Sequence, residues 1–142
     1  MIVNVINKSN YDLPAYATEQ SAGMDLRANI DEPIVLKAHC SAVVGTGIHI
    51  GLPEGYEAQV RGRSGLAFKY DIISHVGTID ADYIGEIHVK LFNLSNADYV
   101  IYPGERISQL VINKIEHIEW NEVTELETTE RGEGGFGHTG KN

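Results

Sequence analysis

Two carboxylates and a tyrosine fall within one short glycine-bounded turn, GTIDADYIG, which runs from Gly77 to Gly85. An aspartate at the tip of a hairpin can act as a general base toward water, so Asp80 is a candidate for that role. Tyr83 can pack its ring against a sugar or a base. An Asx turn beside a packed aromatic ring explains the same residues equally well on local evidence.

A second patch, RGRSGLAFKY (61–70), combines two arginines, a serine and a glycine ahead of a short helical turn. Free amides at the start of a helix bind phosphate, and arginine and hydroxyl groups reinforce that binding. Ser64 is expected to cap the helix. A solvated basic turn is the alternative, because such clusters are common in loops.

Two further patches each contribute one polar residue. In SAGMDLRA (21–28), Asp25 lies between two apolar residues, where a carboxylate needs a partner or a role, although capping a turn would also satisfy it. In PGERISQ (103–109), Gln109 lies on the strand that follows a Pro-Gly turn. Taken alone, that patch is a plain turn leading into a strand.

The closing residues RGEGGFGHTGKN (131–142) hold five glycines around a single aromatic ring, Phe136. The run GFGHTGK nearly matches the phosphate-loop pattern, which next requires Ser or Thr and a helix. Asn142 takes that place, which argues against the phosphate-loop nucleotide hydrolases. Bare amides with one cation can nevertheless wrap phosphates.

The elements that must position these patches are short strands. YEAQVRG (56–62) and EIHVKLFN (86–93) alternate apolar and polar residues with period two, and SAVVGTGIHIG (41–51) is β-branched and punctuated by glycine. Turn signals such as LPEG and YPGE separate the runs, and no long window has a helical period. The sequence predicts an all-β, jelly-roll-like sandwich with one short helix after Ser64.

The run RISQLVINKIE (106–116) is apolar on both faces, with Ile107 and Val111 on one and Leu110 and Ile112 on the other. Such a strand needs cover on both sides, which suggests a neighbouring subunit. Beyond it the chain becomes acidic and polar and is expected to stay extended. We therefore divide the chain into a β-domain, 1–120, and a linker with a glycine-rich arm, 121–142.

Composition narrows the class of partner. The chain has 142 residues, the usual size of one domain, and a formal net charge of −9, which argues against nucleic acid and anionic membranes as partners. Cys40 is the only cysteine, so no internal disulfide is expected, and it is interpreted as a small buried hydrophobe. The N-terminal residues do not resemble a signal peptide, which favours a cytoplasmic location.

The order and spacing of the five patches resemble the trimeric dUTP diphosphatase family, the dUTPases. AGMDL is similar to the first of that family's five motifs, RSGLAFK to the second, GTIDADYIGE to the third, GERISQL to the fourth and RGEGGFGHTG to the fifth. Together they span nearly the whole chain. Five motifs in order are far more specific than any one of them.

The resemblance implies a jelly-roll or β-clip subunit in a homotrimer with exchanged C-terminal arms. Three active sites are each shared by all three chains: motifs one, two and four come from one subunit, the third from a second and the tail from the remaining one. The implied reaction is hydrolysis of dUTP to dUMP and diphosphate, which limits uracil in DNA and supplies the thymidylate precursor. Mg²⁺ is implied on the triphosphate, held by phosphates and water rather than by direct protein ligands.

The family's residue roles carry over motif by motif. Asp80 is the implied activator of the water that attacks the α-phosphorus, and Tyr83 is implied to stack under the deoxyribose. The backbone near Val76 and Gly77 is implied to read the uracil edge. The implied phosphate-binding residues are Arg63, Ser64, Gly65 and Gln109. Asp25 is implied to order the site, through Arg63 or metal-bound water.

The fifth motif implies a lid over a neighbouring subunit's site. Arg131 pairs with the terminal phosphate region and Phe136 lies over the uracil, with Gly137, His138 and Thr139 completing the lid. His138 stands where the family usually has serine, and we expect it to steepen the pH dependence of activity because histidine titrates near neutrality. The second motif also departs from the family, because glycine replaces the usual proline at position 62.

Two alternatives remain. A dCTP deaminase shares the fold and trimer but uses a glutamate on the strand after the third motif, where this chain has Lys90. A catalytically inactive trimeric binding module is the other alternative. It would be expected to have lost Asp80, Tyr83 or Arg131, and all three are present.

Overall fold

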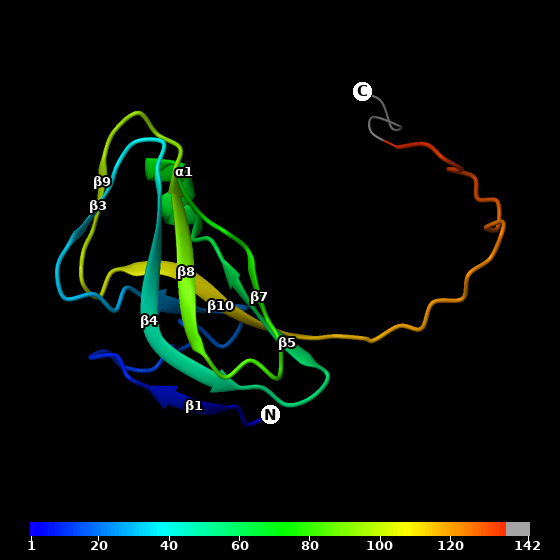
Figure 1. Cartoon of the computed structure of the whole chain (residues 1–142), viewed down its shortest axis with the longest axis horizontal. Helices are drawn as coiled ribbons and strands as arrows, with labels where there is room; N and C mark the ends of the chain where they lie inside the picture. The colour runs from blue at the N-terminus through cyan, green and yellow to red at the C-terminus, as the bar shows by residue number, and fades with distance from the viewer. Residues whose placement is uncertain (136–142) are drawn as a thin grey trace.

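The computed structural model describes residues 1–135 and builds them from strands with one short helix (Figure 1). In chain order the elements are β1 (Asn4–Asn7), β2 (Gly23–Arg27), β3 (Ile34–Leu36), β4 (Ser41–Gly51), β5 (Tyr56–Arg61), α1 (Ser64–Tyr70), β6 (Ile72–Ser74), β7 (Gly77–Ile79), β8 (Glu86–Asn93), β9 (Tyr99–Ile101) and β10 (Arg106–Lys114). The all-β class with a helix after position 63 is confirmed.

Two four-stranded sheets form the sandwich. Their strand orders are β1-β4-β8-β6 and β2-β10-β5-β7, and β3 pairs with β9 in a separate two-stranded ribbon. All pairings between these strands, within the described part of the chain, are antiparallel. Most neighbours in a sheet are distant in sequence, as expected for a jelly roll, in which long connections cross between sheets.

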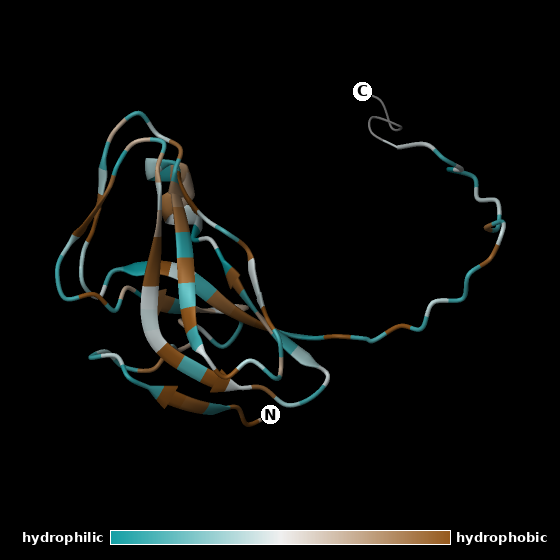
Figure 2. Ribbon diagram, in the orientation of Figure 1, coloured by the Kyte–Doolittle hydropathy of each residue, from teal (hydrophilic) through white to brown (hydrophobic). Residues whose placement is uncertain are grey.

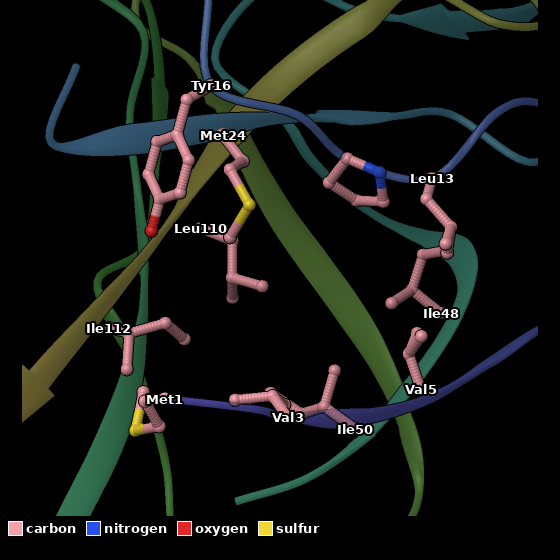
Figure 3. A pocket seen from close by; sticks show the side chains of 11 residues that line it. Met1, Val3, Val5, Leu13, Tyr16, Met24, Ile48, Ile50, Leu110 and Ile112 are labelled. Atoms are coloured by element: carbon pink, nitrogen blue, oxygen red, sulfur yellow. The ribbon is translucent and has the colours of Figure 1, made fainter. Parts of the chain in front are cut away.

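The core draws on both sheets. Val89 and Leu91 of β8 and Leu26 of β2 are fully buried members of one apolar cluster. Figure 2 shows the resulting alternation of hydrophobic and hydrophilic residues along β8. The buried polar side chains are paired: the Thr46 hydroxyl donates to the Ile87 carbonyl at 2.7 Å. The burial pattern therefore follows the period of two that identified these strands.

A β-bulge interrupts the pairing of β10 with β2. Arg106 lies opposite Arg27 and Ser108 lies opposite Leu26, so one extra residue of β10, Ile107, lies between positions that pair with adjacent residues of β2. Beyond the bulge, β10 pairs regularly, with Gln109 opposite Asp25 on β2. Ile107 and Ser108 at the bulge are both buried, and so are Leu110 and Val111 beyond it.

Helix α1 differs from the prediction at its start. Arg63, not Ser64, occupies the N-cap position, in an extended conformation and with no side-chain capping bond. The helix is anchored by Leu66, its one buried residue, and ends at Tyr70. Asp71 follows as the C-cap, with a left-handed φ of 54°. Aspartate tolerates that conformation better than most residues, which explains the sharp stop.

Cys40 is exposed, which overturns its interpretation as a buried hydrophobe. It follows His39, whose φ of 60° is left-handed, and its N–H donates to the Lys37 carbonyl across a turn. The turn between β3 and β4 therefore carries Cys40 to the surface.

The chain beyond β10 forms no helix or strand as far as residue 135. Figure 1 shows this segment running away from the sandwich. Trp120 and Leu126 are almost fully exposed on it, as expected for an extended linker, while the division at residue 120 stays a prediction. None of the helices within residues 1–135 has the length and apolar character needed to cross a membrane.

Candidate functional site

The site residues predicted from the sequence fall into two groups that line separate pockets. In the first group, Gln109 pairs with Arg61 at the end of β5 and lies opposite Asp25 on the other side of β10. In the second group, β7 runs beside β5 from Gly77, opposite Val60, to Ile79, opposite Ala58, and Asp80 follows directly. Within the described residues, one subunit does not gather the predicted residues around a single pocket.

Asp25, Arg63 and Arg106 form the arginine–carboxylate cluster of the first group. The Arg63 Nε donates to Asp25 Oδ1 at 2.9 Å, and the Arg106 guanidinium donates to Asp25 Oδ2 at 3.3 Å. A second nitrogen of Arg63 donates to the Arg106 backbone carbonyl at 2.9 Å. The Asp25 carboxylate is thus paired with two guanidinium groups. The cluster keeps a net positive charge, which suits the binding of an anion.

The start of α1 adds polar groups to this end of the molecule. Ser64 and Gly65 directly follow Arg63 and are both exposed, so their hydroxyl and backbone groups are accessible. Gln109 and Asp25 line a pocket of about 270 Å³ together with residues of the segment before β2. This end therefore offers arginine, hydroxyl and amide groups, the types that bind phosphate oxygens.

The second group surrounds a pocket between the β7 hairpin and β8. Its volume is about 270 Å³. The lining residues are Val60, Gly77, Thr78, Ile79, Asp80, Tyr83, Glu86, Ile87 and His88. Val76 is exposed beside the hairpin and does not line this pocket. The pocket mixes apolar walls with a few polar groups, as small-molecule sites do.

Tyr83 is held in place by the turn that carries it. Its N–H donates to the Asp80 carbonyl at 3.1 Å, and its hydroxyl donates to the Glu86 carbonyl at 2.9 Å. The ring packs over Gly85, where a Cβ would lie 2.4 Å from the Tyr83 hydroxyl. Glycine is therefore required at that position for the ring to lie against the hairpin.

Asp80 presents an exposed carboxylate to the same pocket. Exposure keeps the carboxylate accessible to water, and the pocket beside it can hold an organic group. A general base needs both access to its water and a fixed reacting partner.

Glu86 and His88 line this pocket and were not among the predicted site residues. Both lie on β8, facing away from the buried Ile87 between them. Glu86 Oε1 accepts the Gly47 N–H at 2.8 Å, which fixes the carboxylate. The period of two along β8 indicated that Glu86 and His88 face outward. No pattern in the sequence indicated that the β7 hairpin would form a pocket over that face.

Of the site residues predicted in the tail, Arg131 alone falls within the described part of the chain. It is exposed, and its Nε donates to the Gly134 carbonyl at 2.8 Å. Phe136, Gly137, His138 and Thr139 lie outside the described residues. Their predicted roles in a lid stay predictions.

A partly buried tyrosine braces the turn before Arg106. The Tyr99 hydroxyl donates to Glu105 Oε1, while Glu105 Oε2 accepts the Tyr102 N–H at 3.0 Å. Burial raises the pKa of Tyr99 well above its ordinary value, and the hydrogen bond to Glu105 raises it further. Both oxygens of the Glu105 carboxylate therefore accept hydrogen bonds from residues of this turn.

The described residues provide no ready-made metal centre. No group of three or more His, Cys, Asp or Glu side chains between positions 1 and 135 is placed to hold an ion. Both Asp25 oxygens already accept hydrogen bonds from arginine. These donors fit a divalent ion only where phosphate oxygens and water supply most of its ligands.

Known proteins resemble this chain in sequence and in fold. The family model named dUTPase matches residues 9–140. The deoxyuridine 5'-triphosphate nucleotidohydrolase of Fusobacterium nucleatum is 57% identical over 141 residues, covering 98% of this chain and 97% of the relative. That of Finegoldia magna is 53% identical over 142 residues, covering 99% of each.

Solved structures agree with the sequence matches. A mutant dUTPase of Staphylococcus bacteriophage 80alpha with dUpNHpp superposes with a TM-score of 0.89 at 29% identity, covering 98% of each chain. A mutant dUTPase from phage phi11 of S. aureus, described for its structural Mg(II) ion, gives a TM-score of 0.79 at 26% identity. It covers 88% of this chain and 98% of its own.

Proposed function

This chain belongs to the dUTPase family, and from that membership we propose that it hydrolyses dUTP to dUMP and diphosphate, with Asp80 activating the attacking water. The observation that carries the assignment of Asp80 is its place in the hairpin pocket beside Tyr83. The pocket takes the nucleoside, which brings the α-phosphorus next to the Asp80 carboxylate.

Asp80 accepts a proton from the water as the water attacks the α-phosphorus. The bond from that phosphorus to the bridging oxygen breaks, and diphosphate leaves. A carboxylate is a modest base, so most of the rate comes from positioning and from stabilising the charge on the phosphates. Removing such a base typically costs about 10²–10⁴ in rate.

The hairpin pocket provides specificity. The Tyr83 ring, fixed by its hydrogen bonds and by Gly85, packs under the deoxyribose and leaves no room for a 2′-hydroxyl. The backbone near Val76 and Gly77 reads the uracil edge. We extend the base-reading wall to His88, which lines the pocket from β8.

The phosphates bind at the Arg61 end of β5, on Arg63, Ser64, Gly65 and Gln109. Asp25 orders this end through its ion pair with Arg63. Because the two groups line separate pockets of one chain, a complete site takes the nucleoside pocket from one subunit and the phosphate-binding group from another. The separate pockets support a homotrimer with three shared sites, to which a third chain's arm adds Arg131 and Phe136.

A Mg²⁺ ion bound to the triphosphate would neutralise phosphate charge and help to orient the leaving group. Phosphate oxygens and water would hold most of its coordination sites, with Asp25 and Gln109 nearby. A cytoplasmic location stays a prediction from the sequence.

The two rival functions differ from this proposal at specific residues. Lys90 lies on the outer face of β8, with its ammonium 5.4 Å from the Phe92 ring centre, where a deaminase would need a carboxylate. An inactive binding module does not require the hydrogen bonds that hold Tyr83 beside Asp80. Neither rival therefore explains the hairpin pocket as well.

Diphosphate release from dUTP, dTTP, dCTP and UTP, measured side by side with Mg²⁺, tests the function. We expect release from dUTP alone and no ammonia from dCTP. The Asp80→Asn variant should turn over dUTP about 10²–10⁴-fold more slowly while still binding dUpNHpp. Release from all four nucleotides, or none from dUTP, would overturn the proposal.

A further inference from the structure

We propose that Glu86 is a positioning residue of the hairpin pocket. Its carboxylate fastens the β7–β8 hairpin, which carries Tyr83, to a bulge in β4 and so sets how strictly the pocket excludes a 2′-hydroxyl. The inference deepens the proposed function and rests on it. It also explains the glycines of β4, a strand that lines neither the hairpin pocket nor the pocket beside Gln109.

The bulge lies where β4 pairs with β8. Gly45 lies opposite His88 and His49 lies opposite Glu86, so three residues of β4 lie across from the single residue Ile87 of β8. Extra residues in one strand disrupt the ladder locally, and such bulges are frequent next to active sites. The backbone groups released from the ladder need other partners.

Glu86 provides one of these partners. Its Oε1 accepts the Gly47 N–H at 2.8 Å, and its side chain is 32% exposed. The φ of 69° at Gly47 is left-handed, a conformation that favours glycine. Gly45 is needed as well, because a Cβ there would lie 2.6 Å from the same oxygen. The two glycines therefore shape a socket for one oxygen of the Glu86 carboxylate.

The same residue holds the Tyr83 ring. The Tyr83 hydroxyl donates to the Glu86 carbonyl at 2.9 Å, so the position of the ring follows that of the Glu86 backbone. His49 in β4 adds a second tie, because its Nδ1 lies 3.2 Å from the carbonyl of Ile84, the residue after Tyr83. The bulge region of β4 thus fastens the turn at two points, and Glu86 is the one that lines the pocket.

This fastening bears on the choice between deoxyribose and ribose. The pocket excludes a 2′-hydroxyl only while the Tyr83 ring stays close to the sugar, and the hydroxyl end of the ring is tied to Glu86. Releasing the carboxylate from Gly47 frees the start of β8, so the ring can retreat. Small displacements of a positioning group have large effects on reaction and binding. UTP should therefore compete better with dUTP when the Glu86 carboxylate is lost.

Competition kinetics on the full-length protein with Mg²⁺ test this role. The measured quantity is the inhibition constant of UTP divided by the KM of dUTP, a ratio that does not depend on the fraction of enzyme that is folded. We expect Glu86→Ala to lower this ratio about tenfold. Glu86→Gln keeps an oxygen that can accept the Gly47 N–H, and its ratio should stay within about threefold of the wild type.

Gly45→Ala reaches the same contact from β4, because its Cβ would displace Glu86 Oε1. It should lower the ratio about tenfold in the wild type. It should lower the ratio no further in Glu86→Ala, where the displaced oxygen is absent, since changes at one contact are not additive.

Glu57→Ala is the matched control. Glu57 is a partly buried carboxylate on β5 that accepts a hydrogen bond from the Gln59 amide at 2.6 Å, and it lines neither pocket. Its removal should change the ratio less than about twofold.

A wild-type ratio in Glu86→Ala would overturn the positioning role of Glu86, and so would equal losses in Glu86→Gln and Glu86→Ala. Additive losses from Gly45→Ala and Glu86→Ala would overturn it too, because the two changes would then act separately. A wild type that releases no diphosphate from dUTP would instead overturn the proposed function.

Discussion

The Arg63 Nε lies 2.9 Å from Asp25 Oδ1, although the two residues are 38 positions apart in the chain. This ion pair joins the loop before α1 to β2. Both side chains are about three-quarters shielded from solvent. The pair therefore fixes where the exposed groups that follow Arg63 face.

Asp25→Asn should weaken both stability and substrate binding. The change removes the charge that separates Arg63 from Arg106, so two cations are left facing each other. We expect the free energy of unfolding to fall by about 1–2 kcal/mol and the KM for dUTP to rise about tenfold. Urea denaturation and steady-state kinetics measure the two effects. Asp31→Asn, at an exposed bend, is the control, and an unchanged KM would remove Asp25 from the site.

The space around Gly62 admits the Cβ of the proline that the family usually has there. A Cβ built there would lie 3.4 Å from the Ser74 Oγ and 3.6 Å from the Ser74 nitrogen, which are ordinary contacts. Arg61 before it is in a strand, the conformation that proline requires of its predecessor. Gly62→Pro should raise the free energy of unfolding by about 0.4–1 kcal/mol, because the unfolded chain loses freedom.

The measurement for Gly62→Pro is the urea midpoint at constant m-value. Gly55→Pro is the contrasting variant, since the φ of 81° at Gly55 is one that proline cannot adopt. It should destabilise the protein. A destabilised Gly62→Pro would show that the loop needs glycine for a reason other than space.

Tyr99 should make stability fall at alkaline pH. Its pKa is higher in the folded protein than in the unfolded chain, so the unfolded state alone releases the proton above about pH 10. The stabilising contribution is therefore full below that pH and declines as pH rises through the folded pKa. The gap in unfolding free energy between wild type and Tyr99→Phe should narrow from pH 9 to pH 11. Tyr102→Phe, at an exposed tyrosine, should give a constant gap.

Strand positions could be predicted from the sequence because burial alternates along them. The run 86–93 forms β8 with the expected inward Ile87, Val89 and Leu91. The helix after position 63 was also predicted. The prediction of Ser64 as its N-cap was wrong. Capping preference favours serine by residue type, but in the structure Arg63 occupies the N-cap position and makes no side-chain capping bond.

The cluster around Asp25 was only partly predictable. A period of two places Arg106 and Gln109 on opposite faces, and only the bulge brings Arg106 to Asp25. Periodicity likewise showed that Glu86 and His88 face outward, but not that the β7 hairpin would form a pocket over them. Bulges and hairpin closure depend on contacts between distant residues, which local patterns do not encode.

Mixing two inactive variants should restore activity if the site is shared between subunits. Asp80→Asn keeps its phosphate group intact, and Arg63→Ala keeps its nucleoside pocket intact. In a randomly mixed trimer, a site that takes each part from a different chain is whole about one time in four, so about a quarter of wild-type activity should return.

The experiment is refolding or co-expression of the two variants at equal amounts, followed by measurement of diphosphate release. Each variant refolded alone is the control and should stay inactive. Combining Asp80→Asn with Tyr83→Ala provides a second control, because both changes fall in the nucleoside pocket and no mixed site is whole. If the first mixture stayed as inactive as its components, Asp80 and Arg63 would have to act within one chain, and a conformational change would be needed to bring their separate pockets together.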